Sequence, residues 1–246
     1  MNQSADAKRQ GKRVAIIQSN YIPWKGYFDI INMVDEFILY DDRQYTKRDW
    51  RNRNVVKTAN GLRWLTIPVR VKGRFEQRID ETVIDEPSWA ASHWRTIAQE
   101  YAGAAHFKAY RDRVGELFAD ATMPRLSEVN RHFIEGICGI LGITTKISWS
   151  TDYDARGDRT DRLVSLCTQA GATEYLSGPA ARAYIDESLF TAAGVTLRYM
   201  DYSGYPEYPQ LHGAFEHGVT VLDLIFNAGP DARGYMKSFG ATVTTS

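Results

Sequence analysis

Residues 13–42, RVAIIQSNYIPWKGYFDIINMVDEFILYDD, decide the fold. The run at 13–18 is short and apolar and ends in a polar residue, which is typical of a parallel strand buried on both faces. Residues 24–36 place apolar side chains at helical spacing, and a second apolar run follows at 37–42. Strand, helix and strand within about 30 residues make a βαβ unit, whose connection should be right-handed. This stretch therefore predicts an α/β protein.

A hairpin and a block of helices interrupt the alternation of strands and helices. Asn60-Gly61 separates the stretches 54–58 and 63–71, which predicts an antiparallel hairpin with an Asn-Gly turn. Apolar residues then recur every three or four positions, which predicts three helices. Their expected bounds are about 87–101, 104–119 and 124–141.

Strands and helices alternate again towards the carboxyl terminus. The expected strands are 144–151, 174–178 and 197–202, and the expected helices are 158–171 and 219–229. We therefore expect one α/β domain over residues 13–240, with a Rossmann-like parallel sheet, a β-hairpin insertion and a central helical insertion at about 87–141. Residues 1–12 are polar and are expected to form a disordered tail.

The amino-acid composition limits the kinds of molecule that the protein is expected to bind. The 246 residues include 30 basic and 30 acidic side chains, so no net charge favours coating nucleic acid or an anionic membrane. No apolar stretch approaches the roughly 20 residues that span a bilayer. Cys138 and Cys167 lie in apolar periodic segments without CxxC spacing, which indicates buried thiols in a reducing cytoplasm. We expect a cytoplasmic protein with a small anionic ligand, and the oligomeric state stays open, a homo-oligomer included.

Three loops that follow expected strands carry the aromatic and charged residues of a site. They lie at 18–27, 41–54 and 177–184. Ligands of open parallel sheets bind outside the carboxyl ends of the strands, so we expect these loops to meet in one site. A Pro-rich aromatic loop at 205–217 is expected to fold over the same rim and to supply His212 as an acid or base.

Each segment also has a purely structural interpretation. Pro23-Trp24 can staple the first helix to the sheet, and Asp41-Asp42 can cap a turn or neutralise neighbouring arginines. The basic run at 47–54 can be a solvated face, and the loop at 205–217 can be a packed lid. The basic, aromatic and acidic residues taken together favour a binding site over these separate interpretations.

The candidate residues follow from these loops. The candidate catalytic residues are Asp41, Asp42 and His212, and no metal ligands are assigned because the histidines lack a metal-binding spacing. The candidate substrate-binding residues are Gln18, Tyr21, Trp24, Gly26, Tyr27, Gln44, Lys47, Trp50, Arg51, Asn52, Arg53, Ser177, Gly178, Arg182 and Tyr208.

Four segments in fixed order resemble one known family. They begin with IIQSNYIPWKGYF…ILYDDRQYTKRDWRNRN and continue with YLSGPAARAYIDESLFTAAGV, YPEYPQLHGAF and VLDLIFNAG. Together they are similar to the WbqC-like family, named after a protein of surface-polysaccharide gene clusters, over about residues 14–229. The resemblance implies a role in making O-antigen or related glycans, often near genes for modified amino sugars.

A weaker resemblance concerns the chemistry. YIPWKGYF and ILYDDRQY are similar in layout to pantothenate synthetase and other nucleotidylyl-transferase-like Rossmann domains. Gly26 and Gln44 match that pattern, whereas Trp24 and Tyr27 stand where the relatives have the histidines of an HxGH turn. This resemblance implies ATP with Mg²⁺ as a cofactor and the joining of a carboxylic acid to an amine. The residues themselves leave the cofactor open.

Two hypotheses follow. In the first, the protein forms an amide on a nucleotide-linked amino sugar. It is then an acyl or aminoacyl transferase, or an ATP-dependent amide-forming enzyme. A diphosphate or a carboxylate would bind to the basic loop, with Arg43, Lys47, Arg51 and Arg53. Aromatic rings would stack on base or sugar, and Asp41, Asp42 or His212 would take the amine proton. In the second, the same pocket belongs to a non-catalytic nucleotide-sugar binding subunit.

Overall fold

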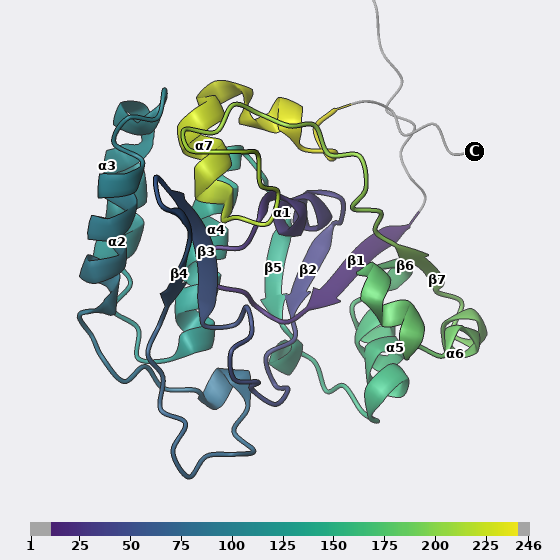
Figure 1. The fold of residues 1–246 in the computed structure, drawn as a ribbon. Coiled ribbons are helices and arrows are strands. Elements are labelled where there is room, and N and C mark those ends of the chain that lie inside the picture. Colours follow the sequence, from purple (N-terminus) through teal and green to yellow (C-terminus); the bar gives the residue numbers. More distant parts are fainter. Residues whose placement is uncertain (1–10, 241–246) are drawn as a thin grey trace, which may run out of the picture.

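A five-stranded parallel sheet forms the centre of the computed structural model, which describes residues 11–240 (Figure 1). Its strands run in the order β5-β2-β1-β6-β7. Their bounds are Lys12–Ile17 for β1, Glu36–Leu39 for β2, Lys146–Trp149 for β5, Ala172–Ser177 for β6 and Thr196–Tyr199 for β7. The chain extends the sheet on one side from β1 through β2 to β5 and then returns to place β6 on the other side of β1. The order therefore reverses between β1 and β6.

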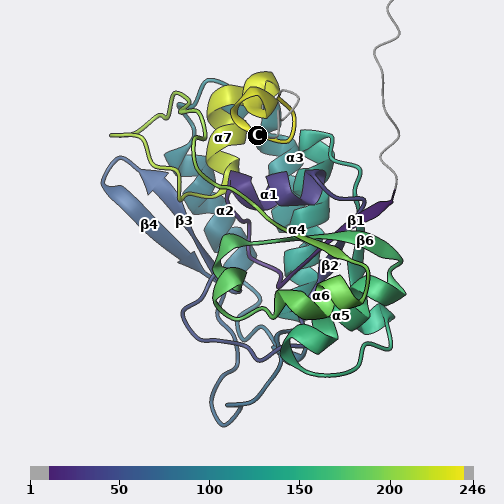
Figure 2. The same cartoon turned by 90° about the vertical axis from the view of Figure 1, so that its right-hand side faces the viewer.

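Helices cover both faces of this sheet, because strand side chains alternate between the faces. Val14 and Ile16 of β1 pack with Leu166 of α5 (Arg159–Gln169) and Phe190 of α6 (Glu187–Ala192). Ala15 belongs to the core of the opposite face, with α1 (Lys25–Asn32), α4 (Leu126–Leu141) and α7 (Val221–Ala228). Figure 2 shows α5 and α6 on the side away from α1 and α7. The two cores confirm the expected α/β layering.

The hairpin and the middle helices stand beside the main sheet. Strands β3 (Arg53–Thr58) and β4 (Gly61–Thr66) pair antiparallel, and α2 (Trp89–Glu100) lies next to them (Figure 1). Helix α3 (Phe107–Ala119) packs between α2 and α7. The three predicted helices of this block are thus confirmed, each starting two or three residues later than expected.

Three details differ from the sequence-based expectation. The second hairpin strand ends at Thr66, not at residue 71, because Pro68 cannot donate to a ladder. Helix α6 was not predicted, since six residues are too few for a clear period. Strand β1 starts at Lys12, inside the expected tail, and residues 1–10 of that tail lie outside the described residues.

The segment after β7 crosses the α1 side of the molecule. Val221 donates its N–H to the carbonyl of Pro23, 2.9 Å away, and the ammonium of Lys25 donates to the carbonyl of Pro206 at 3.0 Å. The same ammonium lies 5.0 Å from the ring centres of Tyr205 and Tyr208. These contacts tie the aromatic loop to the first turn of α1.

Over the described part of the chain, no helix has the length and apolar character needed to cross a membrane.

Candidate functional site

A cleft with a volume of about 840 Å³ opens at the carboxyl ends of β1 and β6. Gln18, the first residue after β1, and Ser177 and Gly178, at the end of β6, form its floor. This is the point where the strand order reverses, and the strand ends there diverge and leave a crevice between them. The location confirms that the loops after β1, β2 and β6 meet.

The charged side chains that line the cleft are all cationic. They are the guanidinium groups of Arg43, Arg51 and Arg159. Among the described residues, no carboxylate and no histidine lines this cleft. Guanidinium groups match the geometry of phosphate and carboxylate oxygens, so the cleft favours an anionic ligand.

Neighbouring groups fix two of these arginines. The guanidinium of Arg43 lies 4.8 Å from the ring centre of Tyr40 and 3.1 Å from a carboxylate oxygen of Asp42. Arg51 donates to the side-chain oxygen of Asn20. Arg159, with a φ of 41°, starts α5 in the left-handed region. Such a backbone is uncommon for a non-glycine residue and turns the side chain to the cleft.

Aromatic rings form the walls of the cleft. Trp24, Tyr27, Trp50 and Tyr202 line it, and the rings of Trp24 and Tyr202 meet edge to face with centres 5.2 Å apart. Trp24 and Trp50 also line an adjoining cavity of about 210 Å³. Aromatic faces of this kind suit a nucleobase or a sugar ring.

Gly26 allows the indole of Trp24 to fold over the start of α1. A Cβ at position 26 would lie 2.3 Å from the Cζ2 atom of this indole. Gly26, predicted to bind substrate, is therefore a packing residue. It shapes the wall without lining the cleft.

Two buried asparagines of the basic loop hold neighbouring segments in place, Asn54 the β1–α1 loop and Asn52 the chain after β4. The amide of Asn54 donates to the carbonyls of Tyr21 and Ile22, both at 2.9 Å. Ile22 has a φ of 34°, which a β-branched residue rarely adopts. Asn52 donates to the carbonyl of Ile67 at 2.8 Å. The amide of Asn54 thus fixes the loop that leads into Trp24, and the amide of Asn52 fixes the chain at the end of the hairpin.

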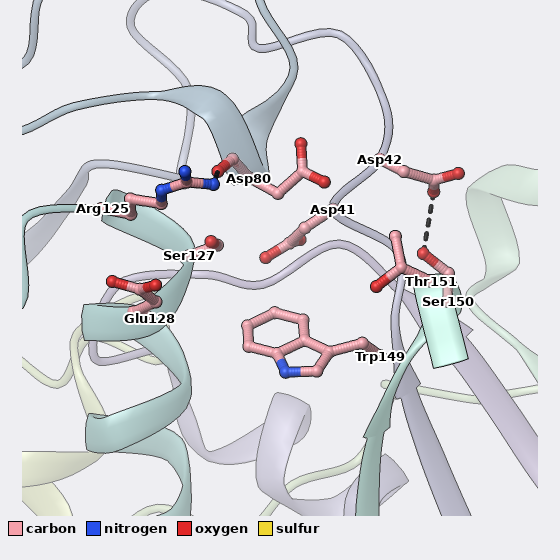
Figure 3. A pocket seen from close by; sticks show the side chains of 9 residues that line it. All are labelled: Asp41, Asp42, Asp80, Arg125, Ser127, Glu128, Trp149, Ser150 and Thr151. Atoms are coloured by element: carbon pink, nitrogen blue, oxygen red, sulfur yellow. Dashed lines mark hydrogen bonds between the residues drawn. The ribbon is translucent and has the colours of Figure 1, made fainter. Parts of the chain in front are cut away.

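A second, acidic pocket of about 200 Å³ lies at the ends of β2 and β5 (Figure 3). Tyr40 and Arg43 face the cleft, whereas Asp41 and Asp42 between them line this pocket. Asp80 and Glu128 add two further carboxylates, and α4 begins at its edge. The end of β2 thus separates a cationic cleft from an acidic pocket.

Asp41 and Asp42 have opposite electrostatic surroundings. Burial raises the pKa of Asp41 to about 6, although the N–H of Ser19 donates to its Oδ1 at 2.7 Å and the charge of Arg51 opposes the shift. Its Oδ2 is buried and has no hydrogen-bond partner among the described residues. Burial also acts on Asp42, but hydrogen bonds from Arg43 and Ser150 and the charges of Arg43 and Arg162 outweigh it and lower the pKa. A carboxyl whose pKa lies near neutrality can act as an acid or base.

The structure brings about half of the predicted binding residues together. Those that line the cleft are Gln18, Trp24, Tyr27, Gln44, Trp50, Arg51, Ser177 and Gly178. Those that do not line it are Tyr21, Gly26, Lys47, Asn52, Arg53, Arg182 and Tyr208. Tyr21 and Tyr208 are core residues, whose hydroxyls bond to His93 and to the buried Asp223. Lys47 and Arg182 are exposed and lie against the rings of Phe75 and Tyr199.

His212 lies outside both the cleft and the acidic pocket. Its Nε2 is 2.9 Å from the carbonyl of Glu100, the last residue of α2. The loop that carries it covers α1 and the start of α7, not the strand ends, because Lys25 lies against the rings of Tyr205 and Tyr208 and Asp223 accepts from the Tyr208 hydroxyl. We therefore assign His212 no role in the site.

Sequence reasoning missed Asn20, Arg159 and Tyr202 as cleft residues, and Asp80 and Glu128 as lining of the acidic pocket. Arg159 could have been found, because it follows the Gly-Asp pair that starts a predicted helix after a strand. Asp80 and Glu128 come from the inserted segments, whose position against the sheet no local pattern encodes.

The fold and the cleft define a Rossmann-like α/β protein with a cationic, aromatic-walled crevice at its strand ends. The chain belongs to the WbqC-like protein family, whose model matches residues 18–235. It is similar to the uncharacterized protein Rv1507c of Mycobacterium tuberculosis (strain ATCC 25618 / H37Rv), with 52% identity over 226 residues that cover 92% of this chain and 98% of the relative. No solved structure matches the chain.

Proposed function

We propose that this chain is a transferase that forms an amide on the amino group of a nucleotide-linked sugar, in the biosynthesis of O-antigen or another surface glycan. One observation carries the proposal: three guanidinium groups and several aromatic rings surround a cleft at the reversal point of the sheet, and no carboxylate of the described residues lines it. Family membership supports a role in polysaccharide biosynthesis.

The cleft suits both parts of such a ligand. Its volume of about 840 Å³ lies in the range of about 300–1,000 Å³ that is usual for small-molecule sites. Arg43, Arg51 and Arg159 would bind the diphosphate, because guanidinium groups bind phosphate oxygens with paired hydrogen bonds. Trp24 and Trp50 would lie against the base or the sugar ring.

Asp41 is the proposed base. In the reaction a C–N bond forms between the acyl carbon and the sugar nitrogen, the bond between the acyl carbon and its carrier breaks, and the carrier leaves with the electron pair. The sugar ammonium loses two protons on the way to the amide. The first passes to the carboxylate of Asp41, whose pKa of about 6 suits proton transfer near neutral pH, and the second, released after the C–N bond forms, passes to the leaving carrier. Asp42 stays ionised beside Arg162 and orients the loop. The two free, buried thiols agree with a cytoplasmic location.

A non-catalytic binding subunit is the second candidate. The observation that favours it is the cleft itself, which no carboxylate and no histidine of the described residues lines. In that case the chain would escort the nucleotide-linked sugar, and Asp41 would have no chemical role.

Turnover and binding separate these candidates. The purified chain is incubated with a UDP-linked 2-amino sugar and, in turn, an acyl thioester or an amino acid with ATP and Mg²⁺, and the products are analysed by mass spectrometry. A transferase yields the amide, and Asp41→Asn loses turnover but still binds UDP in the cleft, which Asp41 does not line. Binding without turnover for every donor supports the subunit, and the absence of binding contradicts both candidates.

A further inference from the structure

The carboxylates of the acidic pocket differ in how fully they are neutralised. Asp42 accepts from Ser150 at 2.8 Å and pairs with Arg43 and Arg162. Asp80 accepts two hydrogen bonds from Arg78, at 2.9 and 3.0 Å. Both carboxylates already have cationic partners, so neither needs a ligand.

Asp41 and Glu128 lack such partners. Asp41 is 1% exposed, and its Oδ2 has no hydrogen-bond partner within residues 11–240. Figure 3 shows this carboxylate directed across the pocket towards the first turn of α4, above the ring of Trp149. The side chain of Glu128, in that first turn, makes no hydrogen bond or ion pair with any other described residue. A buried carboxylate oxygen without a donor is costly, which points to a ligand that donates.

The surroundings select a cation over an anion. The amides at the start of α4 favour negative charge, but Glu128 in its first turn already supplies that charge. The one cation in the lining, Arg125, donates to the main-chain carbonyl of Asp80 at 3.2 Å. The unneutralised charge that remains is that of Asp41 and Glu128. The ring of Trp149 beside them attracts cations, and the guanidinium of Arg131 already lies 5.1 Å from its centre.

The same surroundings favour an ammonium group over a divalent metal ion. Within the described residues, no three His, Cys, Asp or Glu side chains gather closely enough to hold a metal ion. Two separate carboxylates, the hydroxyl of Ser127 and an aromatic face instead suit a group with several N–H donors. A volume of about 200 Å³ admits a small amine or the amino end of a larger molecule.

We infer that the acidic pocket is a subsite for a primary ammonium group, bound between Asp41 and Glu128 over the ring of Trp149. This inference deepens the proposed function and rests on it for the identity of the amine, which would be the amino group that receives the acyl group. The cationic cleft would then bind the diphosphate and the acidic pocket the amino group, on either side of the end of β2.

The test uses the six tryptophans as separate reporters. The indole N–H signals of the ¹⁵N-labelled full chain are assigned with single Trp→Phe variants, and the chain is titrated with ethanolamine and, separately, with inorganic pyrophosphate. We expect ethanolamine to shift the Trp149 signal saturably, and pyrophosphate to shift the signals of Trp24 or Trp50. Asp41→Asn and Glu128→Gln should each weaken ethanolamine binding about tenfold or more, since each removes a charged hydrogen-bond acceptor.

Glu116→Gln on the exposed side of α3 is the matched control, because it removes one negative charge away from the pocket. The inference is overturned if ethanolamine leaves Trp149 unchanged, if MgCl₂ and not ethanolamine shifts it, or if the pocket variants behave like Glu116→Gln. A response to pyrophosphate alone refutes the ammonium subsite and leaves the anion-binding cleft standing. A response to ethanolamine alone refutes the cleft and keeps the subsite.

Discussion

Asp41 and Asp42 are adjacent in the chain, yet Asp42 pairs with two arginines, while one buried carboxylate oxygen of Asp41 has no donor among residues 11–240. Burial raises the pKa of Asp41, whereas hydrogen bonds from Arg43 and Ser150 and the nearby arginine charges outweigh burial and lower the pKa of Asp42. Neighbouring carboxyls with separated pKa values commonly divide the acid–base and structural roles of a site. The pair therefore gives two stability predictions of opposite sign.

Asp41→Asn should stabilise the folded protein above pH 6. Burial raises the pKa of Asp41 from 3.8 to about 6, so the ionised form is penalised in the folded state. This penalty is absent below the unfolded pKa and is complete once the pH exceeds the folded pKa. We expect a gain on the order of 3 kcal/mol at pH 8 and almost none at pH 4, measured by urea denaturation. Equal free energies of unfolding for Asp41→Asn and the unchanged protein at pH 8 would show that burial does not destabilise the ionised carboxylate of Asp41.

Asp42→Asn should have the opposite effect. Its folded pKa is lowered, so its contribution to stability is present above the unfolded pKa and is lost as the pH falls through the folded pKa. The substitution also leaves Arg162 without its carboxylate partner. We expect a loss of about 2 kcal/mol at pH 7 that shrinks on acidification. A loss that is independent of pH would mean that the ion pair contributes little.

Arg51→Ala and Arg159→Ala should each weaken the binding of inorganic pyrophosphate by about tenfold, because each removes a charged donor from the cleft. The binding should also weaken with added salt. Isothermal titration calorimetry measures both effects. Arg182→Ala is the matched control, since this arginine is exposed and stacks on Tyr199 outside the cleft. If all three variants bind equally, the cleft is not the anion site.

Gly26→Ala should displace the indole of Trp24, because the new methyl group would lie 2.3 Å from its Cζ2 atom. We expect a lower melting temperature and a shifted indole N–H signal for Trp24. Gly234→Ala, where a Cβ would have no atom within 4 Å, is the control and should change neither. An unchanged Trp24 signal in Gly26→Ala would show that the structure accommodates the methyl group without displacing the indole.

The sequence predicted the parallel sheet well, because buried strands such as residues 13–18 and amphipathic helices leave periodic signals. It also predicted the cleft loops at 18–27 and 41–54, since strand ends meet at one edge of a sheet. The position of the loop at 205–217 depended on two buried polar partners, Asp223 shortly after the loop and Lys25 far away in the chain, and no local pattern encodes such contacts. For the same reason Asn52 was mistaken for a ligand residue, although it braces the hairpin.

The most direct test is a crystal structure of the chain grown with a UDP-linked 2-amino sugar. We expect density for the diphosphate within hydrogen-bond distance of Arg51 and Arg159, with the base or sugar ring against Trp24 or Trp50. Density for the ligand elsewhere, or an empty cleft at a concentration that saturates binding in solution, would contradict the proposed site.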